Sequence, residues 1–191
     1  MESQSKIVDR AETYWFIEPG YTTAHFKIGN LFFFTVAGSF AEVAGTVTLD
    51  ETDLRRSSVT ANIRTACINT GNKRRNAHLR SATFLDAEQF PEITFRSTSV
   101  EKGRDRDTLD VAGTLTIKNI SRDIRLLVTL VDRSRSPQGE EILYLTAVTE
   151  LNRHQFGVSA LRGLIGGKLK VTIHVQAQKQ GSIRIAGTER I

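Results

Sequence analysis

The sequence predicts an all-β fold: an eight-stranded antiparallel barrel with a short helical insert near residues 74–90. Apolar and polar residues alternate along many short segments, and turn residues separate these segments at nearly regular intervals. Only one stretch, residues 70–98, changes from a strand pattern to a helical pattern and back. A closed barrel of about eight strands leaves no unpaired edge. A two-sheet sandwich is the competing geometry, and counting strands does not separate the two.

Size and composition indicate one soluble domain. The chain has 191 residues, of which 39% are hydrophobic and 25% charged, so it can bury a substantial core. Its 26 Lys and Arg exceed its 21 Asp and Glu, which permits weak attraction to anionic ligands without requiring it. The single cysteine, Cys67, forms no intrachain disulfide. Because residues 1–13 lack a secretory signal and no apolar run is long enough to span a membrane, we predict a cytoplasmic protein.

Strands are predicted throughout the first half of the chain. They cover residues 14–18, 22–28, 31–37, 45–49 and 58–69. In the second of them, Ala24, Phe26 and Ile28 alternate with polar residues, which gives the strand one apolar face and one solvent-exposed face. We expect the third and fourth strands to pair as neighbours.

The helical insert follows a turn rich in charged residues. Leu79, Ala82 and Thr83 recur at helical spacing, with basic and polar side chains on the other side. Residues 86–89 suggest a second helical turn. Pro91 ends it, because proline lacks an N–H and biases the preceding residue toward an extended conformation.

The strand pattern resumes after the insert. The predicted strands of the second half are residues 92–101, 108–117, 122–131, 142–152 and 169–178. Residues 153–168 are glycine-rich and irregular. We therefore place the barrel domain at residues 14–178, with an N-terminal extension at residues 1–13 and a loose C-terminal tail at residues 179–191.

Five segments carry a resemblance to a known family: residues 15–19 (WFIEP), 38–40 (GSF), 70–98, 113–117 (GTLTI) and 151–157 (LNRHQFG). Together they resemble the YceI family of polyisoprenoid-binding, lipocalin-like proteins over residues 14–176, and residues 78–91 are the most specific part. The resemblance implies an extended eight-stranded lipocalin-like barrel around a long apolar cavity for an isoprenoid or fatty-chain amphiphile. Tyr21, Asn30 and Asn76 depart from the family pattern, which concerns head-group contacts and not the barrel.

Such a cavity would bind its ligand by hydrophobic transfer, without any catalytic group. Each CH₂ moved from water to an apolar wall gains ~0.8 kcal/mol. The predicted cavity residues are Phe26, Phe34, Phe40, Ile63, Leu79, Phe84, Phe95, Leu115 and Phe156. For each of them, simple core packing is the alternative role. The cavity itself is what the family resemblance implies and does not follow from the number of aromatic residues.

A basic cluster in the insert is the predicted head-group site: Arg74, Arg75, His78 and Arg80. Guanidinium groups near a barrel mouth could hold a phosphate or another polar head by charge-assisted hydrogen bonds. The alternatives are a solvated helix face and, for His78, a structural bond to a strand carbonyl. We expect the insert to close one end of the barrel with three inward side chains: Leu79, Phe84 and Phe90. Arg153 is predicted to pair with Asp86 or Glu88.

Other function classes find little support in the sequence. The four histidines (His25, His78, His154 and His174) are too scattered for a zinc motif, so we predict no metal, no cofactor and no enzymatic activity. Acidic residues interrupt most basic stretches, which argues against nucleic acid. A structural or stress-associated barrel with a filled core and no lipid stays open as the alternative function. A homodimer and a transient membrane contact also stay open.

Overall fold

The computed structural model describes residues 6–30 and 35–189. They form one antiparallel sheet of eleven strands and a single α-helix, α1 (Lys73–Arg80). The strands are β1 (Lys6–Ile17), β2 (Thr23–Asn30), β3 (Thr35–Phe40), β4 (Val43–Asp50), β5 (Ser58–Arg64), β6 (Ile68–Asn69), β7 (Glu92–Lys102), β8 (Thr108–Ile117), β9 (Ile120–Arg135), β10 (Glu141–Asn152) and β11 (Ile165–Glu189). Short 3₁₀ turns occupy Leu54–Arg56, Thr65–Cys67 and Arg153–Phe156.

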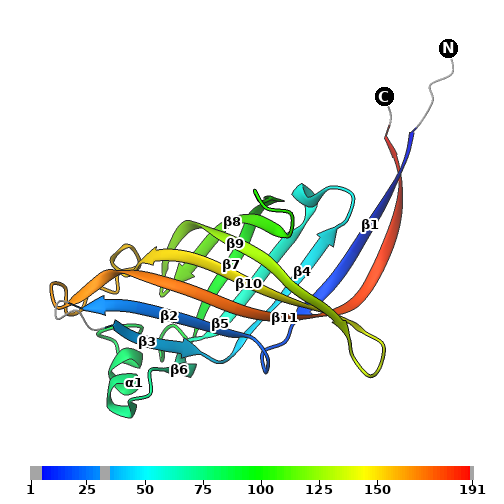
Figure 1. The fold of residues 1–191 in the computed structure, drawn as a ribbon. Coiled ribbons are helices and arrows are strands. Elements are labelled where there is room, and N and C mark those ends of the chain that lie inside the picture. Colours follow the sequence, from blue (N-terminus) through cyan, green and yellow to red (C-terminus); the bar gives the residue numbers. More distant parts are fainter. Residues whose placement is uncertain (1–5, 31–34, 190–191) are drawn as a thin grey trace.

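The eleven strands occupy eight positions around a closed barrel (Figure 1). Strands β1 and β2 pair one after the other with the long β11, so together they fill one position. Strands β4 and β3 fill the next position, because they pair with β1 and β2 respectively. Strands β5 and β6 continue the same way, and β7, β8, β9 and β10 lead back to β11. The predicted eight-stranded antiparallel barrel is therefore confirmed, and the sandwich is excluded.

One predicted strand pairing is wrong. Strands β3 and β4 do not pair with each other but follow one another in the same direction, joined only by residues 41–42. Both look like normal half-buried strands in sequence, and nothing local distinguishes a hairpin from an interrupted strand. Residues 31–34 of the predicted strand 31–37 lie outside the described residues.

The predicted extension and tail are also partly wrong, because their described residues form strands. Strands β1 and β11 pair from Lys6↔Glu189 to Ile17↔Ala177. Strand β4 joins β1 only from Glu12 onward, so the outer part of this pair extends past the barrel as a two-stranded ribbon (Figure 1). Residues 181–183 are exposed, and a strand exposed on both faces needs no apolar alternation, which is why its pattern is weak in the sequence.

The helical insert is shorter than predicted. Helix α1 begins after Asn72, whose side chain accepts a hydrogen bond from the Arg75 N–H (2.9 Å), and ends at Ser81. The expected second helical turn at residues 86–89 is a series of turns instead. Asp86 has a φ of 51°, in the left-handed region, and its N–H bonds to the Ser81 carbonyl (2.9 Å), which breaks the helical pattern.

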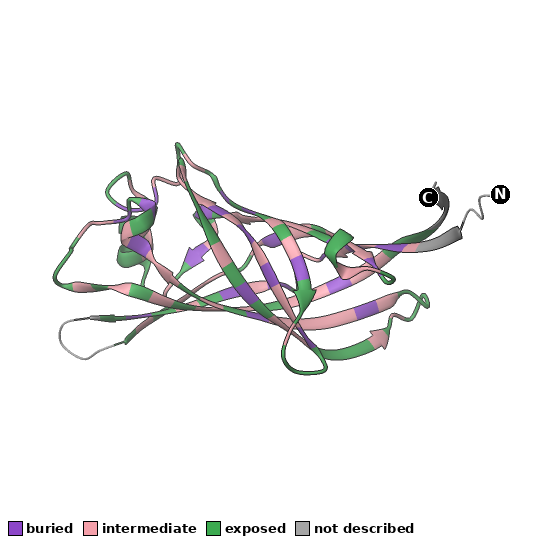
Figure 2. Ribbon diagram, turned by 90° about the horizontal axis from the view of Figure 1, so that it is seen from above, coloured by how far each residue is buried: buried purple, intermediate pink, exposed green. Residues whose placement is uncertain are grey.

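The barrel interior is apolar but incompletely packed. Buried positions recur along the strands between exposed ones, as alternation requires (Figure 2). A dense cluster on β7, β8 and β9 includes Phe95, Val111 and Leu126. On β10, by contrast, Leu143 and Leu145 are only half-buried although they point inward. Inward side chains keep exposed surface because they face a hollow.

Candidate ligand-binding cavity

The hollow is a cavity of about 880 Å³ inside the barrel. Its volume is in the range of small-molecule binding sites. Every barrel position contributes lining residues, nearly all of them aliphatic or aromatic, and none of the described lining residues is an Asp or Glu. Strand β11 shows how the sequence produces this wall, because Leu169, Val171 and Ile173 point inward at every second position.

The structure places eight of the nine predicted cavity residues in this lining. They are Phe26, Phe40, Ile63, Leu79, Phe84, Phe95, Leu115 and Phe156. Phe34 lies outside the described residues. Phe90 does not line the cavity, so its predicted inward position is wrong; its ring lies 6.0 Å from the Lys118 ammonium instead. A role of the eight lining residues in ligand binding stays a prediction.

The opening of the cavity is marked by side chains that line it and are also exposed. Four of them belong to α1 and its N-cap: Asn72, Arg74, Arg75 and His78. Leu161 stands across from them in the loop of residues 157–164. Helix α1 and the loop both lie at the end of the barrel opposite the ribbon (Figure 1), and we call this the open end.

The four predicted head-group residues differ in how they are held. Arg75 donates from Nε to Thr70 Oγ1 (2.8 Å) and from Nη2 to the Thr70 carbonyl (2.7 Å). Arg80 does not line the cavity and donates to the Ala66 carbonyl (3.2 Å). Arg74 makes no hydrogen bond or ion pair with any described residue, so its five N–H donors are available to a ligand.

His78, the remaining head-group candidate, packs its ring edge-on against the Phe84 ring at a centroid distance of 4.9 Å. Phe84 is itself buried in a cluster with Ile68, Leu85 and Val158. The contact orients the imidazole at the opening while its polar atoms remain accessible. No bond from the His78 side chain to a strand carbonyl is present among the described residues, so the predicted structural role by that route is wrong.

Arg153, at the open end, is a buried charged residue that is fixed by hydrogen bonds to the backbone. It is 7% exposed and its guanidinium donates to four backbone carbonyls: Val158 (2.8 Å), Ala160 (2.8 Å), Gly166 (2.9 Å) and Ile165 (3.0 Å). The predicted ion pair with Asp86 or Glu88 is therefore wrong. Burial lowers the pKa of the Arg153 guanidinium, and the charge of Arg162 lowers it further. Arg153 lines the cavity and adds a buried positive charge to it.

Two groups of catalytic type, His154 and Cys67, have pKa values shifted by their surroundings. Burial and then the positive charges of Arg153 and Arg162 lower the pKa of His154, whose Nδ1 is buried without a hydrogen-bond partner among the described residues. Burial and a hydrogen bond with Glu42 raise the pKa of the Cys67 thiol, which disfavours the nucleophilic thiolate.

The described part of the chain contains neither a cluster of metal ligands nor a membrane-spanning helix. No three His, Cys, Asp or Glu side chains there come together as metal ligands. No helix there is long and apolar enough to cross a membrane.

Sequence reasoning missed two residues of the opening, Asn72 and Leu161. Asn72 had only a turn signal, and its place at the opening depends on where α1 docks. Leu161 lies in an irregular loop and has a φ of 54°, which no sequence pattern indicates. The only available signal was the glycine-rich composition of residues 153–168, which is typical of functional loops.

Several solved structures share this fold. BcnA of Burkholderia cenocepacia superimposes with a TM-score of 0.74 at 18% identity, over 84% of this chain and 98% of that one. A polyisoprenoid binding domain from Saccharophagus degradans gives a TM-score of 0.63 at 13% identity, over 86% and 97%. Because both identities are low, these likenesses show the fold alone.

Relatives found by sequence are more similar to this chain than these structures are. Protein YceI of Salmonella newport and of Escherichia coli O157:H7 are each 29% identical to this chain over 163 residues, which cover 85% of this chain and 84% of each relative. The family model described as YceI-like domain matches residues 15–177, almost the whole barrel. The resemblance carried by the sequence segments is thereby confirmed: this chain belongs to the YceI-like family.

Proposed function

We propose that this protein binds the apolar chain of an isoprenoid or another long-chain amphiphile inside the barrel, and carries or stores it without chemical conversion. The observation that carries this proposal is the apolar cavity, whose charged lining residues in the described part of the chain are all cations near its opening. An apolar tail fits the wall, and a polar head fits the opening. The polyisoprenoid-binding domain that shares the fold supports the ligand class.

Hydrophobic transfer alone is large enough to hold such a ligand. A tail with ten buried carbons gains roughly 8 kcal/mol before the cost of ordering is subtracted, at ~0.8 kcal/mol for each CH₂. The inward alternation of apolar residues on every strand supplies the surface for this transfer. Binding therefore requires no reactive group in the barrel.

The opening favours a head group that is anionic or rich in hydrogen-bond acceptors. Arg74 has free donors, and Arg75 and His78 stand beside it on α1. Arg153 contributes a fixed positive charge to the same cavity, and no carboxylate of residues 6–30 or 35–189 lines the cavity to compensate for it. A phosphate would accept charge-assisted, bidentate hydrogen bonds from such guanidinium groups.

The competing hypothesis of a filled structural barrel has less support. Protein interiors are normally packed like organic crystals, with few voids larger than a water molecule. A cavity of about 880 Å³ is a departure that a purely structural barrel does not need. A cytoplasmic location and a homodimer remain predictions from the sequence.

Extraction of the purified protein with organic solvent, followed by mass spectrometry, tests the proposal. We expect about one amphiphile for each chain, with an apolar tail and an acidic head. The matched control is Ala147→Phe, which places a ring in the cavity at a buried alanine of β10 and should retain much less lipid. Wild-type protein that is free of lipid, and that fails to take up an added prenyl phosphate, would refute the proposal.

A further inference from the structure

We propose that the open end docks on an anionic membrane surface through the turn of residues 161–164, which we call the docking turn. This inference rests on the proposed function, because it names the surface from which the amphiphile enters the cavity. Three features of the open end carry it: two exposed leucines, a rigid frame behind them, and an excess of positive charge around them.

The docking turn presents two large apolar side chains to solvent. Leu161 is 46% exposed and Leu164 is 48% exposed. The Leu161 carbonyl accepts hydrogen bonds from the N–H groups of Leu164 (3.0 Å) and Ile165 (3.1 Å), and Gly163 takes a φ of 92° to close the turn. Exposed apolar side chains beside a polar rim are typical of interaction sites.

A rigid frame holds these leucines outward. The Arg153 guanidinium binds the Val158 and Ala160 carbonyls on one side of the docking turn and the Ile165 and Gly166 carbonyls on the other. The base of the loop is fixed as well, because Val158 and Ala160 pack with Leu79 and Phe84. The leucines are thus presented in a fixed arrangement, and docking pays little ordering entropy.

The segments that border the opening carry only positive charge. Residues 66–85 contain Lys73, Arg74, Arg75 and Arg80, and residues 153–168 contain Arg153, Arg162 and Lys168, with no Asp or Glu in either. The rest of the sequence has 19 Lys and Arg against 21 Asp and Glu, so the excess positive charge of the whole chain lies within these two segments. Apolar side chains within a basic surface match the interface of an anionic bilayer.

Docking there would let the amphiphile enter the barrel without contact with water. Leu161 is half exposed and also lines the cavity, so one side chain connects the outer surface with the inner wall. A tail leaving the bilayer along Leu161 would reach the cavity without crossing water. This continuity favours a lipid surface over a protein partner, since the cavity's own ligand class resides in membranes.

Sedimentation with lipid vesicles tests the proposal. Wild-type protein should partition about tenfold more strongly to vesicles of phosphatidylcholine mixed with phosphatidylglycerol than to pure phosphatidylcholine. Leu164→Ser should lower this partition about tenfold, and Arg162→Ser about fivefold. Neither residue lines the cavity. The matched control is Val131→Ser, which removes a 64% exposed apolar side chain of β9 away from the opening and should leave the partition unchanged.

The outcomes separate docking from amphiphile binding. Binding of a soluble short-chain prenyl phosphate without vesicles should be the same in wild type, Leu164→Ser and Arg162→Ser. Equal partition of wild type to both vesicle types, or an equal loss in Val131→Ser and Leu164→Ser, would overturn the docking proposal and leave the proposed function intact. Vesicle binding that responds to both substitutions, in a protein that takes up no prenyl phosphate, would support docking and refute the proposed function.

Discussion

The two ends of the barrel each bury a charged side chain, and the two charges are satisfied in different ways. Asp50, at the end of β4 on the ribbon side, is fully buried. Arg153, at the open end, is nearly so. The carboxylate of Asp50 serves a compact turn built from its own neighbours, whereas the guanidinium of Arg153 connects separate parts of a loop.

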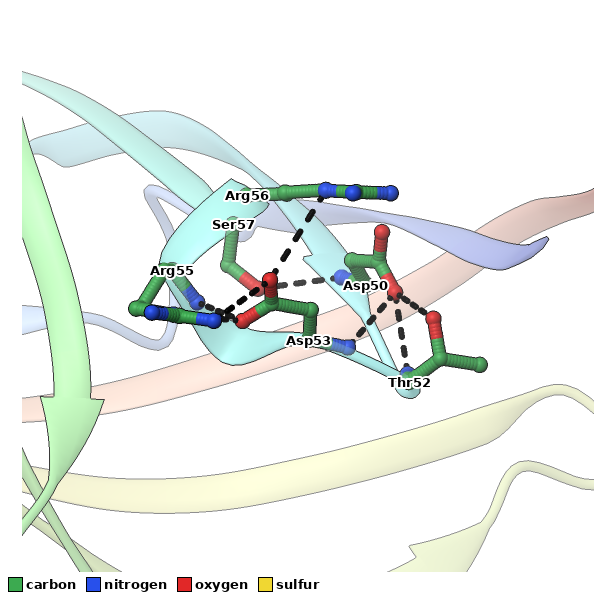
Figure 3. A network of polar contacts seen from close by, with 6 residues as sticks. All are labelled: Asp50, Thr52, Asp53, Arg55, Arg56 and Ser57. Atoms are coloured by element: carbon green, nitrogen blue, oxygen red, sulfur yellow. Dashed lines mark hydrogen bonds and ion pairs between the residues drawn. The ribbon is translucent and has the colours of Figure 1, made fainter. Parts of the chain in front are cut away.

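The Asp50 network is local (Figure 3). Asp50 Oδ1 accepts hydrogen bonds from the Thr52 N–H (2.9 Å), the Thr52 hydroxyl (2.6 Å) and the Asp53 N–H (3.0 Å), while the Asp50 N–H donates to Ser57 Oγ (3.0 Å). Asp53 then caps the 3₁₀ turn and pairs with Arg55 (3.0 Å). All of these groups lie within residues 50–57, so these hydrogen bonds close a compact turn.

The hydrogen bonds of Arg153 connect residues that are further apart in the chain, and they leave its positive charge without a negative partner among the described residues. Its four acceptors are neutral carbonyls on both sides of the docking turn, so the positive charge is held but not neutralised. The ribbon end thus uses a buried charge to close a turn, whereas the open end uses a buried charge to hold the loop and to favour anions.

Removing the Arg153 side chain should have the largest effect. Arg153→Met leaves four carbonyls without their donor, so we expect a loss of about 3–5 kcal/mol in the free energy of unfolding, measured in urea. Arg153→Lys should recover only part of it, because an ammonium cannot reach four carbonyls in that geometry. A loss below about 1 kcal/mol in Arg153→Met would show that the loop does not depend on this frame.

Asp50→Ala should have a smaller effect on stability and none on binding. It removes three hydrogen bonds to a buried carboxylate, and we expect a loss of about 2–3 kcal/mol in the free energy of unfolding. Because Asp50 does not line the cavity, the affinity of the folded protein for a prenyl phosphate should stay unchanged in a fluorescence titration. A weaker affinity would contradict the division of roles between the two ends.

Substitutions of Arg74 and Arg80 should differ in their effect on the affinity for a prenyl phosphate. Arg74→Ala should weaken prenyl phosphate binding about tenfold, since a hydrogen bond to a charged group contributes at least about 1.5 kcal/mol. Arg80→Ala is the matched control on the same helix, and its affinity should equal wild type because Arg80 points to the Ala66 carbonyl. Equal losses in the two variants would indicate a general charge effect and no specific contact.

The smallest expected effect is the contribution of His154 to the pH dependence of stability. Because its pKa is lowered in the folded state, the unfolded chain binds more protons, and stability falls as the pH drops below about 6.5. The difference in urea midpoint between about pH 7 and about pH 5 should therefore be smaller in His154→Gln than in wild type. Identical pH profiles would mean that His154 is equally easy to protonate in both states.

Local periodicity predicted most of the strands and their inward faces, whereas the barrel around a cavity was what the family resemblance implied. The inward positions of Phe26, Phe95 and Leu115 follow from alternation along single strands. A helix in the insert followed from the local pattern, although α1 ends at Arg80, earlier than the sequence suggested. These features depend on neighbours in the chain, and the sequence contains them directly.

Features that depend on distant partners were not predictable. Strands β3 and β4 carry ordinary strand patterns, and only the direction of their partners shows that they continue one another. Arg153 was assigned a carboxylate partner because opposite charges pair, yet it binds carbonyls whose positions are set by the loop. A backbone acceptor has no signature in the sequence, so a buried cation of this kind is recognised only in the fold.

The proposed function places the apolar tail of an amphiphile in the cavity and its polar head at the cationic opening. A titration of lipid-free wild-type protein with geranylgeranyl phosphate and with geranylgeraniol, monitored by tryptophan fluorescence from the cavity residue Trp15, tests it most directly. Both ligands should bind, and the phosphate should bind about tenfold more tightly. Failure of both to bind, or tighter binding of the alcohol, would contradict the account.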